Sequence, residues 1–220
     1  MVSRETTGSV PDLPDWLQAR SAVLAAYAEI LAEAGVERGL IGPREVGRLW
    51  DRHLLNCAVV AEPVTCIVPE GSLVGDLGSG AGLPGLVWAI ARPDLRIVLI
   101  EPLLRRSTFL QEAVDRLGLR DQVTVWRGRG EDAPGTISPL DVVTARAVAP
   151  LDRLLGWTTP LLRPGGSLAL LKGSSAAEEV VQAQPTATAL GITGLRVEQV
   201  GVGIVDPPTT VVVGHRGAAE

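Results

Sequence analysis

The sequence predicts an α/β protein in which a mainly parallel sheet is covered by helices on both faces. Two observations lead to this fold class. Apolar runs of strand length alternate with segments of helical periodicity from residue 72 onward. The first such run ends in a glycine-rich turn, Asp76-Leu-Gly-Ser-Gly-Ala-Gly-Leu-Pro-Gly85, that leads directly into a helical segment. Strand, tight turn and helix in this order are typical of sheets that bind nucleotide-like ligands.

The composition is that of one globular unit. The chain has 220 residues, of which 46% are hydrophobic and 20% charged, enough to bury a substantial core. No apolar run reaches the roughly 18 residues of a membrane span, and no signal pattern opens the chain, so we expect a cytoplasmic protein without a membrane partner. Cys57 and Cys66 lack the spacing of metal ligands and are expected to be buried thiols, so no metal site is expected. The net charge of −5 argues mildly against an all-over basic coat, but it leaves room for a local basic face.

Residues 1–66 are expected to form a tail and a helical cap, and residues 67–220 the ligand-binding domain. Helical spacing of apolar residues between 13 and 34 predicts a first helix, which Gly35 and Gly39 interrupt. A second helix is predicted over residues 43–61, where apolar residues follow an i, i+3, i+4, i+7 series. On another face of that helix, arginines recur at i, i+4 and i+8: Arg44, Arg48 and Arg52.

The rest of the chain alternates strand and helix. Strands are predicted near residues 72–77, 96–101, 122–126, 140–145, 167–172, 195–200 and 209–214. Helices are predicted near residues 84–92, 103–117, 150–162 and 175–190. Only a Gly- and Pro-rich stretch, residues 201–208, separates the last two strands, so we expect them to pair antiparallel.

The glycine turn is compatible with two cofactor classes. From Gly80 onward it fits the dinucleotide pattern G-x-G-x-x-G, which alone is a weak signal. Asp76 precedes glycines at 78, 80 and 82, and this Asp-x-Gly-x-Gly-x-Gly pattern is typical of S-adenosylmethionine (SAM) methyltransferases. Glu101 ends the next strand, where its carboxylate can accept hydrogen bonds from ribose hydroxyls in either class. The pattern favours SAM; a dinucleotide, or a turn without ligand, remains the alternative.

Several motifs now occur in a fixed order. They are Arg52-His-Leu-Leu-Asn56, the glycine turn, Glu101, Arg105-Arg-Ser-Thr-Phe-Leu110, Thr144-Ala-Arg-Ala147 and Leu171-Lys-Gly173. Over residues 40–175 the chain resembles the RsmG (GidB) family of small-subunit ribosomal RNA methyltransferases. The resemblance implies a Rossmann-like SAM-dependent methyltransferase fold, with a seven-stranded mostly parallel sheet and an N-terminal helical cap. It implies SAM as cofactor, 16S rRNA or the small ribosomal subunit as partner, and N7 of a guanine as the methylated atom.

The site residues follow from the motifs and from the resemblance. The glycine turn and the strand end assign cofactor contacts to Asp76, Gly78, Gly80, Gly82 and Glu101, and the resemblance adds Leu83, Gly130, Glu131 and Arg146. The chain departs from the family pattern at Ala145 and at Gly39-Leu-Ile41, where the family has Ser and Asn-Leu-Thr, so we assign no role to that Asn.

Guanine N7 carries an in-plane lone pair and no proton, so its methylation needs no general base. Catalysis then depends on alignment and on exclusion of water. Arg146 and Lys172, each at a strand end, are the catalytic candidates. Arg146 can hold the cofactor, donate to guanine O6, or form a plain surface ion pair. Lys172 is expected to point toward the crevice at the carboxyl end of the sheet, with a role toward the RNA or the cofactor; a plain surface lysine is the alternative.

RNA contacts are expected from Arg44, Arg48, Arg52, His53 and Lys172. The three arginines can bind phosphates or form a solvated helix face. His53 lies among apolar positions, where a histidine is more often a hydrogen-bonded core residue than a substrate ligand. Two rival functions remain open: a SAM methyltransferase of small molecules, and a nucleotide-binding module, such as one for NAD, without catalysis.

Overall fold

The seven strands form a single sheet in the computed structural model, which describes residues 10–137 and 139–218. Their order is β3-β2-β1-β4-β5-β7-β6, and β7 runs antiparallel to both its neighbours while the other pairs are parallel. The strands are β1 Leu73–Leu77, β2 Arg96–Ile100, β3 Val123–Trp126, β4 Leu140–Arg146, β5 Leu162–Leu171, β6 Ile192–Val200 and β7 Thr209–Arg216. The predicted fold class and the antiparallel ending are confirmed.

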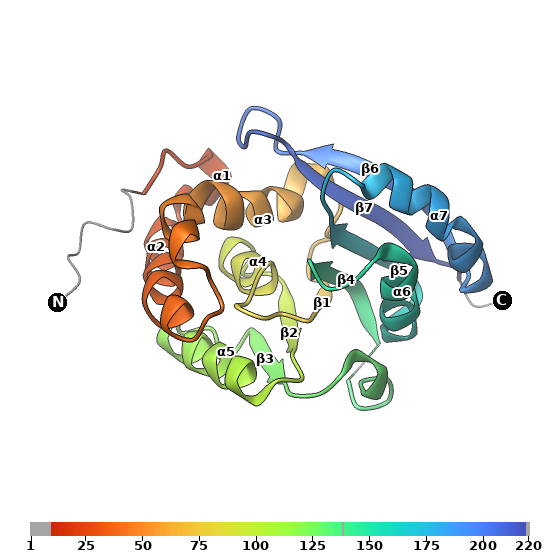
Figure 1. The fold of residues 1–220 in the computed structure, drawn as a ribbon, viewed down its shortest axis with the longest axis horizontal. Helices are drawn as coiled ribbons and strands as arrows, with labels where there is room; N and C mark the ends of the chain where they lie inside the picture. Colours follow the sequence, from red (N-terminus) through yellow and green to blue (C-terminus); the bar gives the residue numbers. More distant parts are fainter. Residues whose placement is uncertain (1–9, 138, 219–220) are drawn as a thin grey trace.

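Helices cover both faces of the sheet (Figure 1). One face carries the cap, α4 and α5, and the other carries α6 and α7. The α-helices are α1 Asp15–Gln18, α2 Ser21–Ile30, α3 Asn56–Ala58, α4 Gly85–Ala91, α5 Leu104–Arg116, α6 Leu151–Thr158 and α7 Ala176–Ala189. No helix within the described ranges has both the length and the apolar character needed to cross a membrane.

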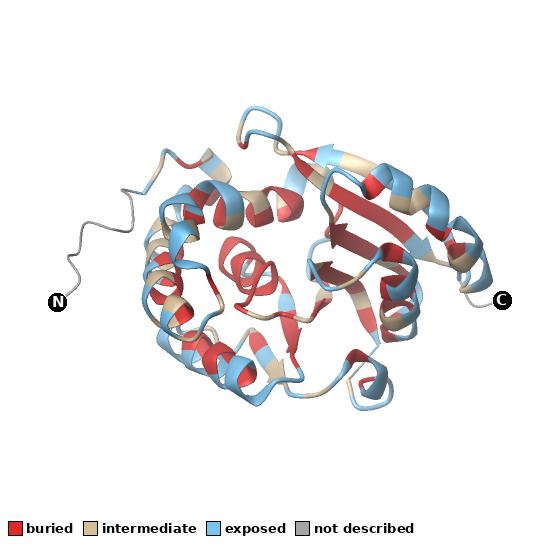
Figure 2. Ribbon diagram, in the orientation of Figure 1, coloured by how far each residue is buried: buried red, intermediate tan, exposed pale blue. Residues whose placement is uncertain are grey.

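Helix α4 lies between the cap and the sheet, and every one of its residues is buried (Figure 2). Its sequence explains this position, because GLVWAIA carries no charged residue and has no polar face to offer water. The Trp88 indole donates a 2.8 Å hydrogen bond to the carbonyl of Cys57 in the cap. The cap and this face of the sheet therefore share one hydrophobic core.

The second predicted cap helix, over residues 43–61, is not one α-helix. A 3-10 segment covers Pro43–Arg48, wide π-type turns cover Leu49–Leu55, and α3 is followed by a 3-10 turn at Val59–Ala61. Gly47 weakens helical order in the first segment. Because a 3-10 helix has three residues per turn, positions four apart diverge by about a third of a turn. Arg44 and Arg48 therefore do not form the expected stripe on one face.

Three smaller expectations also change. The helix predicted between residues 13 and 34 is divided into α1, α2 and a wide turn at Leu31–Gly35. Strand β5 begins before residue 167, because its pairing with β4 contains a register shift that accommodates the Pro-Gly-Gly segment. Cys57 is buried as expected, whereas Cys66 is exposed, at the end of a short 3-10 turn and with a left-handed backbone (φ 53°).

Candidate functional site

The glycine turn lies where the carboxyl ends of β1, β2 and β4 meet. It is fastened to β2 by the amides of Gly78 and Ser79, which both donate to the carbonyl of Ile100 (2.8 and 3.2 Å). Gly78 and Gly82 have positive φ angles of 70° and 96°. A Cβ at Gly78 would lie 2.8 Å from a Val148 methyl, and one at Gly82 would lie 2.5 Å from a Leu86 methyl. The turn therefore requires glycine at both positions.

Asp76 is fully buried at the start of this turn. Its Oδ2 accepts a hydrogen bond from the Gly85 amide (3.0 Å), whereas its Oδ1 is buried without a partner. The nearby Ser79 hydroxyl does not satisfy Oδ1, because it donates to the main-chain carbonyl of Asp76 (2.7 Å). Burial raises the pKa of Asp76 to about 7, although the Gly85 amide opposes this shift. A buried carboxylate oxygen without a partner is costly in its charged form, and the raised pKa of Asp76 reflects that cost.

Glu101 lies directly below the turn and is 1% exposed. Its Oε2 accepts from the Gly80 amide and its Oε1 from the Leu103 amide, both at 3.0 Å. The carboxylate thus shapes the turn as well as carrying negative charge to it. Each carboxylate oxygen has a second acceptor position, so the predicted contact with ribose hydroxyls stays compatible with this arrangement.

Three cavities run in a row across the turn. The first, about 160 Å³, is an apolar slot lined by Leu77, Ile100, Pro102, Val148 and Trp157, with Gly130 and Glu131 at its side. The second, about 360 Å³, contains the turn itself and faces the cap; it shares Gly78 with the first cavity. The third, about 270 Å³, is lined by Asn56, Leu171, Lys172 and Gly173; it shares Arg146 and Ala147 with the second. An elongated ligand can therefore cross the turn and end beside a second ligand at Arg146.

These features fit SAM. The apolar slot offers an adenine ring a flat site, and the Gly130 backbone lines it closely, because a Cβ there would lie 2.5 Å from a Leu77 methyl. Glu101 follows β2, its chain neighbours Ile100 and Pro102 line the slot, and its carboxylate contacts the turn at the Gly80 amide. Of the predicted cofactor residues, Gly78, Gly80, Leu83, Gly130, Glu131 and Arg146 line the first two cavities, whereas Asp76, Gly82 and Glu101 line none of them.

Arg146 is the last residue of β4, and residues of the cap contact its guanidinium group. Its Nη2 lies 2.7 Å from His53 Nδ1, and His53 Nε2 lies 3.1 Å from Glu45 Oε2. Its Nη1 makes longer contacts, to the carbonyl of Arg52 (3.4 Å) and to the Cys57 sulfur (3.7 Å). Burial lowers the pKa of His53, and the positive charge of Arg146 lowers it further. Both ring nitrogens of His53 are thus engaged inside the protein.

The other predicted RNA and catalytic residues have different surroundings. Lys172 Nζ pairs with Glu179 (2.6 Å) and donates to the carbonyl of Ala149 (3.0 Å), so its charge is neutralised although it lines the third cavity. Arg44, Arg48 and Arg52 are exposed and line none of the three cavities. Arg52 lies 3.6 Å from Glu45.

Sequence reasoning missed several residues of the site. Glu45 and Asn56 line the second and third cavities, and the Tyr27 hydroxyl donates to the carbonyl of Ala81 in the glycine turn (2.7 Å). Asn56 belongs to the segment Arg52-His-Leu-Leu-Asn56, so a signal for it was present. Glu45 carried no such signal, because its partner His53 lies eight residues away in an irregular segment.

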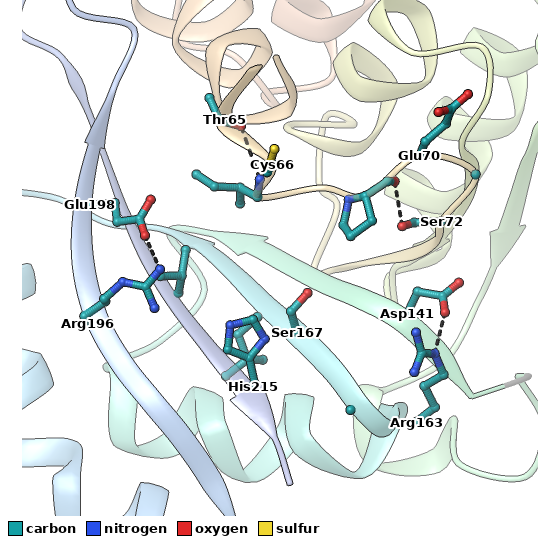
Figure 3. Close-up of a pocket in the computed structure, with 16 residues that line it drawn as sticks. Thr65, Cys66, Glu70, Ser72, Asp141, Arg163, Ser167, Arg196, Glu198 and His215 are labelled. Atoms are coloured by element: carbon teal, nitrogen blue, oxygen red, sulfur yellow. Dashed lines mark hydrogen bonds and ion pairs between the residues drawn. The ribbon is translucent and has the colours of Figure 1, made fainter. Parts of the chain in front are cut away.

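A separate cavity of about 590 Å³ lies at the opposite, amino end of the sheet (Figure 3). Four of its charged side chains pair with one another: Arg163 with Asp141 (2.5 Å), and Arg196 with Glu198. None of the glycine-turn residues lines it. Its size exceeds that of each cavity at the turn, but it contains no unpartnered buried polar atom among the described residues, so we do not place the functional site there.

The sequence matches the family model GidB, described as rRNA small subunit methyltransferase G, over residues 20–204. It is 60% identical over 193 residues to Ribosomal RNA small subunit methyltransferase G of Streptomyces avermitilis, covering 88% of this chain and 79% of that protein. It is 56% identical over 195 residues to the protein of the same name from Mycolicibacterium gilvum, covering 88% of this chain and 83% of that protein.

Among solved structures, the fold is similar to the S-adenosylmethionine-dependent methyltransferase SibL in its apo form. The TM-score is 0.63 at 15% identity, covering 92% of this chain and 70% of that one. At this identity the likeness concerns the fold alone.

Proposed function

This chain belongs to the rRNA small subunit methyltransferase G (GidB) family, and from that premise we propose that it transfers a methyl group from SAM to N7 of a guanine in 16S rRNA. Membership confirms the resemblance drawn from the ordered motifs, and with it the assignment as a methyltransferase. The relatives' names, which specify the small-subunit rRNA, support the substrate.

One observation carries the proposal: the row of cavities that meet at Gly78 and at Arg146. The first two cavities accommodate the cofactor, from the apolar slot to the cap side of the turn. The third accommodates a base, with Asn56 and Arg146 on its wall. Arg146 belongs to both walls, so it lies where donor and acceptor of the methyl group would meet.

SAM, when bound, supplies an electrophilic methyl group on a sulfonium. The protein's residues then have to orient the guanine and keep water away. Arginine often binds guanine through O6 and N7 together, but here N7 must keep its lone pair free for the methyl group. Arg146 is therefore expected to donate to O6 only. The reaction leaves positive charge on the purine, and Asn56, which lines the third cavity, can offer an amide oxygen to stabilise it.

The RNA is proposed to lie across the carboxyl end of the sheet, between the cap and Lys172. Arg44, Arg48 and Arg52 are exposed on the cap side, where they can reach phosphates. Lys172 contributes by holding the loop at Ala149, through the contact with its carbonyl. We also propose that residues 1–66 comprise an N-terminal tail and the helical cap, and residues 67–220 the SAM-binding methyltransferase domain, in an enzyme of the cytoplasm.

The test is transfer of labelled methyl from SAM to small ribosomal subunits that lack their native methylation, followed by strand scission at N7-methylguanine. A single labelled guanine in 16S rRNA is expected. Transfer to small metabolites without transfer to RNA would contradict the proposal and select the rival small-molecule activity. Binding of NAD without binding of SAM would overturn the cofactor.

A further inference from the structure

We propose that Glu45 and His53 form a positioning pair that holds the Arg146 guanidinium in place between the second and third cavities. The inference rests on the proposed function for the purpose of Arg146, and on contacts within the protein for the pairing itself. It gives Glu45 a role, and it changes the expected role of His53 from an RNA contact to a positioning residue.

The contacts fix the protonation of the imidazole ring. A guanidinium can only donate, so His53 Nδ1, 2.7 Å from Arg146 Nη2, has to accept and carries no proton. The ring proton then lies on Nε2, which donates to Glu45 Oε2 at 3.1 Å. The three side chains form a directed chain of hydrogen bonds, from Arg146 through neutral His53 to the Glu45 carboxylate. A carboxylate behind the ring favours this single tautomer and orients the ring, as such partners do for metal-bound histidines.

The charges around His53 keep this arrangement intact. Arg146 and Arg52 both disfavour a protonated ring, and burial acts in the same direction. Glu45 opposes them, but the net effect is a lowered pKa for His53. Glu45 itself stays ionised, because its hydrogen bond with His53 and the charges of Arg52 and Arg48 lower its pKa. At neutral pH the ring is thus an acceptor for Arg146.

The pairing decides where the guanidinium points. Apart from the His53 contact, the hydrogen bonds of Arg146 are the long ones from Nη1 to the Arg52 carbonyl and the Cys57 sulfur. The 2.7 Å contact of Nη2 is therefore the one that restrains the guanidinium plane. The restrained group lines both cavities, and so does Ala147, which follows it and has a left-handed backbone (φ 56°). A guanidinium fixed in this way can present its remaining N–H groups to the base without reorganisation.

Histidine NMR tests the pairing without any activity measurement, because His53 and His215 are the only histidines in the chain. In 15N-histidine spectra of the wild-type protein, we expect His53 to be the Nε2–H tautomer with a pKa below the ordinary histidine value. In Arg146→Gln, the pKa of His53 should rise, because a nearby cation is removed. In Glu45→Gln it should fall further, because an anion is removed. A mixed tautomer that neither substitution moves would overturn the proposal.

Methyl transfer tests the purpose of the pairing. Glu45→Ala is expected to lower kcat by about tenfold or more, since small misplacements of an orienting group have effects of this size. His53→Asn retains an acceptor near the Nδ1 position and should keep more activity than His53→Ala. Glu112→Ala, which breaks a remote surface pair with Arg38, serves as the control with unchanged kcat.

A double-mutant cycle separates positioning from simple structural support. If Glu45 acts through Arg146, the double variant Glu45→Ala/Arg146→Gln should be no slower than Arg146→Gln alone. Losses that multiply would overturn the positioning role. Should wild-type protein methylate no guanine at all, the proposed function fails on that result, and the NMR titrations still decide whether the pairing exists.

Discussion

The buried carboxylates Asp76 and Glu101 at the carboxyl end of the sheet differ from the paired, exposed charges at its amino end. At the amino end, Arg163 pairs with Asp141 and Arg196 pairs with Glu198, and both arginines are at least half exposed. At the carboxyl end, Asp76 is fully buried with one oxygen unpartnered, and Glu101 is buried against main-chain amides. The amino end also has the larger cavity.

The difference shows which property marks a site in this fold. Charges that only need to be stable can pair at the surface, where each pair contributes little. Asp76 and Glu101 are instead buried and hold the backbone of the glycine turn through the amides of Gly85 and Gly80, at a cost to the folded state that a functional site can justify. Cavity size alone would have pointed to the wrong end of the sheet.

The largest effect is expected from Glu101→Ala at the carboxyl end. It removes both the acceptor proposed for ribose and the carboxylate that holds the Gly80 amide, so SAM affinity should fall about a hundredfold, as expected for the loss of charge-assisted hydrogen bonds. Isothermal titration calorimetry measures this directly. Glu101→Gln keeps one acceptor oxygen, so its SAM affinity should lie between those of the wild type and of Glu101→Ala. An unchanged SAM affinity in Glu101→Ala would remove Glu101 from the cofactor site.

Asp76→Asn should weaken SAM binding about tenfold and yet stabilise the free protein at pH 8 by about 1–2 kcal/mol, because it removes a buried charge. The sign follows from the raised pKa of Asp76, about 7. The folded chain holds this proton more tightly than the unfolded chain, so wild-type stability falls as pH rises from about 4 through 7. Asn cannot titrate, so the advantage of the variant should grow over that range. Urea unfolding at pH 5 and pH 8 measures it, and an advantage that shrinks with pH would contradict the assignment.

The double variant Arg44→Ala/Arg48→Ala tests whether the carboxyl-end site extends over the cap. Removal of two phosphate contacts should lower RNA affinity several-fold and reduce the slope of log K against log salt by about 1–2. SAM affinity should not change, because both arginines lie outside the cavities at the turn. Filter binding of 16S rRNA at several salt concentrations gives the slope. An unaltered slope would make these arginines a solvated surface.

The smallest effect is expected at the amino end. Arg163→Ala removes an exposed pair with Asp141, which should cost at most about 1 kcal/mol of unfolding free energy. SAM affinity and methyl transfer should equal those of the wild type. A marked loss of either would show that the two ends are coupled and would weaken the contrast drawn between them.

The sequence predicted the sheet well because its strands are short apolar runs that can be recognised without knowing which strands they pair with. The glycine turn was equally readable, since the positive φ angles of Gly78 and Gly82 admit few other residues. The cap was predicted less well, because residues 43–61 repeat apolar positions at helical spacing while Gly47 and tertiary packing divide the segment into shorter turns. Glu45 could not be found, because its role depends on a chain of contacts through His53 to a strand about a hundred residues away.

The burial of α4 on all sides has a consequence for how the protein unfolds. Its amides are protected by the cap and the sheet together, so they should exchange with solvent only when both open, as one cooperative unit. The cap is tied into the same unit by the Trp88 contact with Cys57 and by the Tyr27 contact with the glycine turn. A proteolytic cut or a destabilising substitution in the cap would thus destabilise α4 and the glycine turn together. It would weaken the cofactor site without altering any residue that faces the ligand.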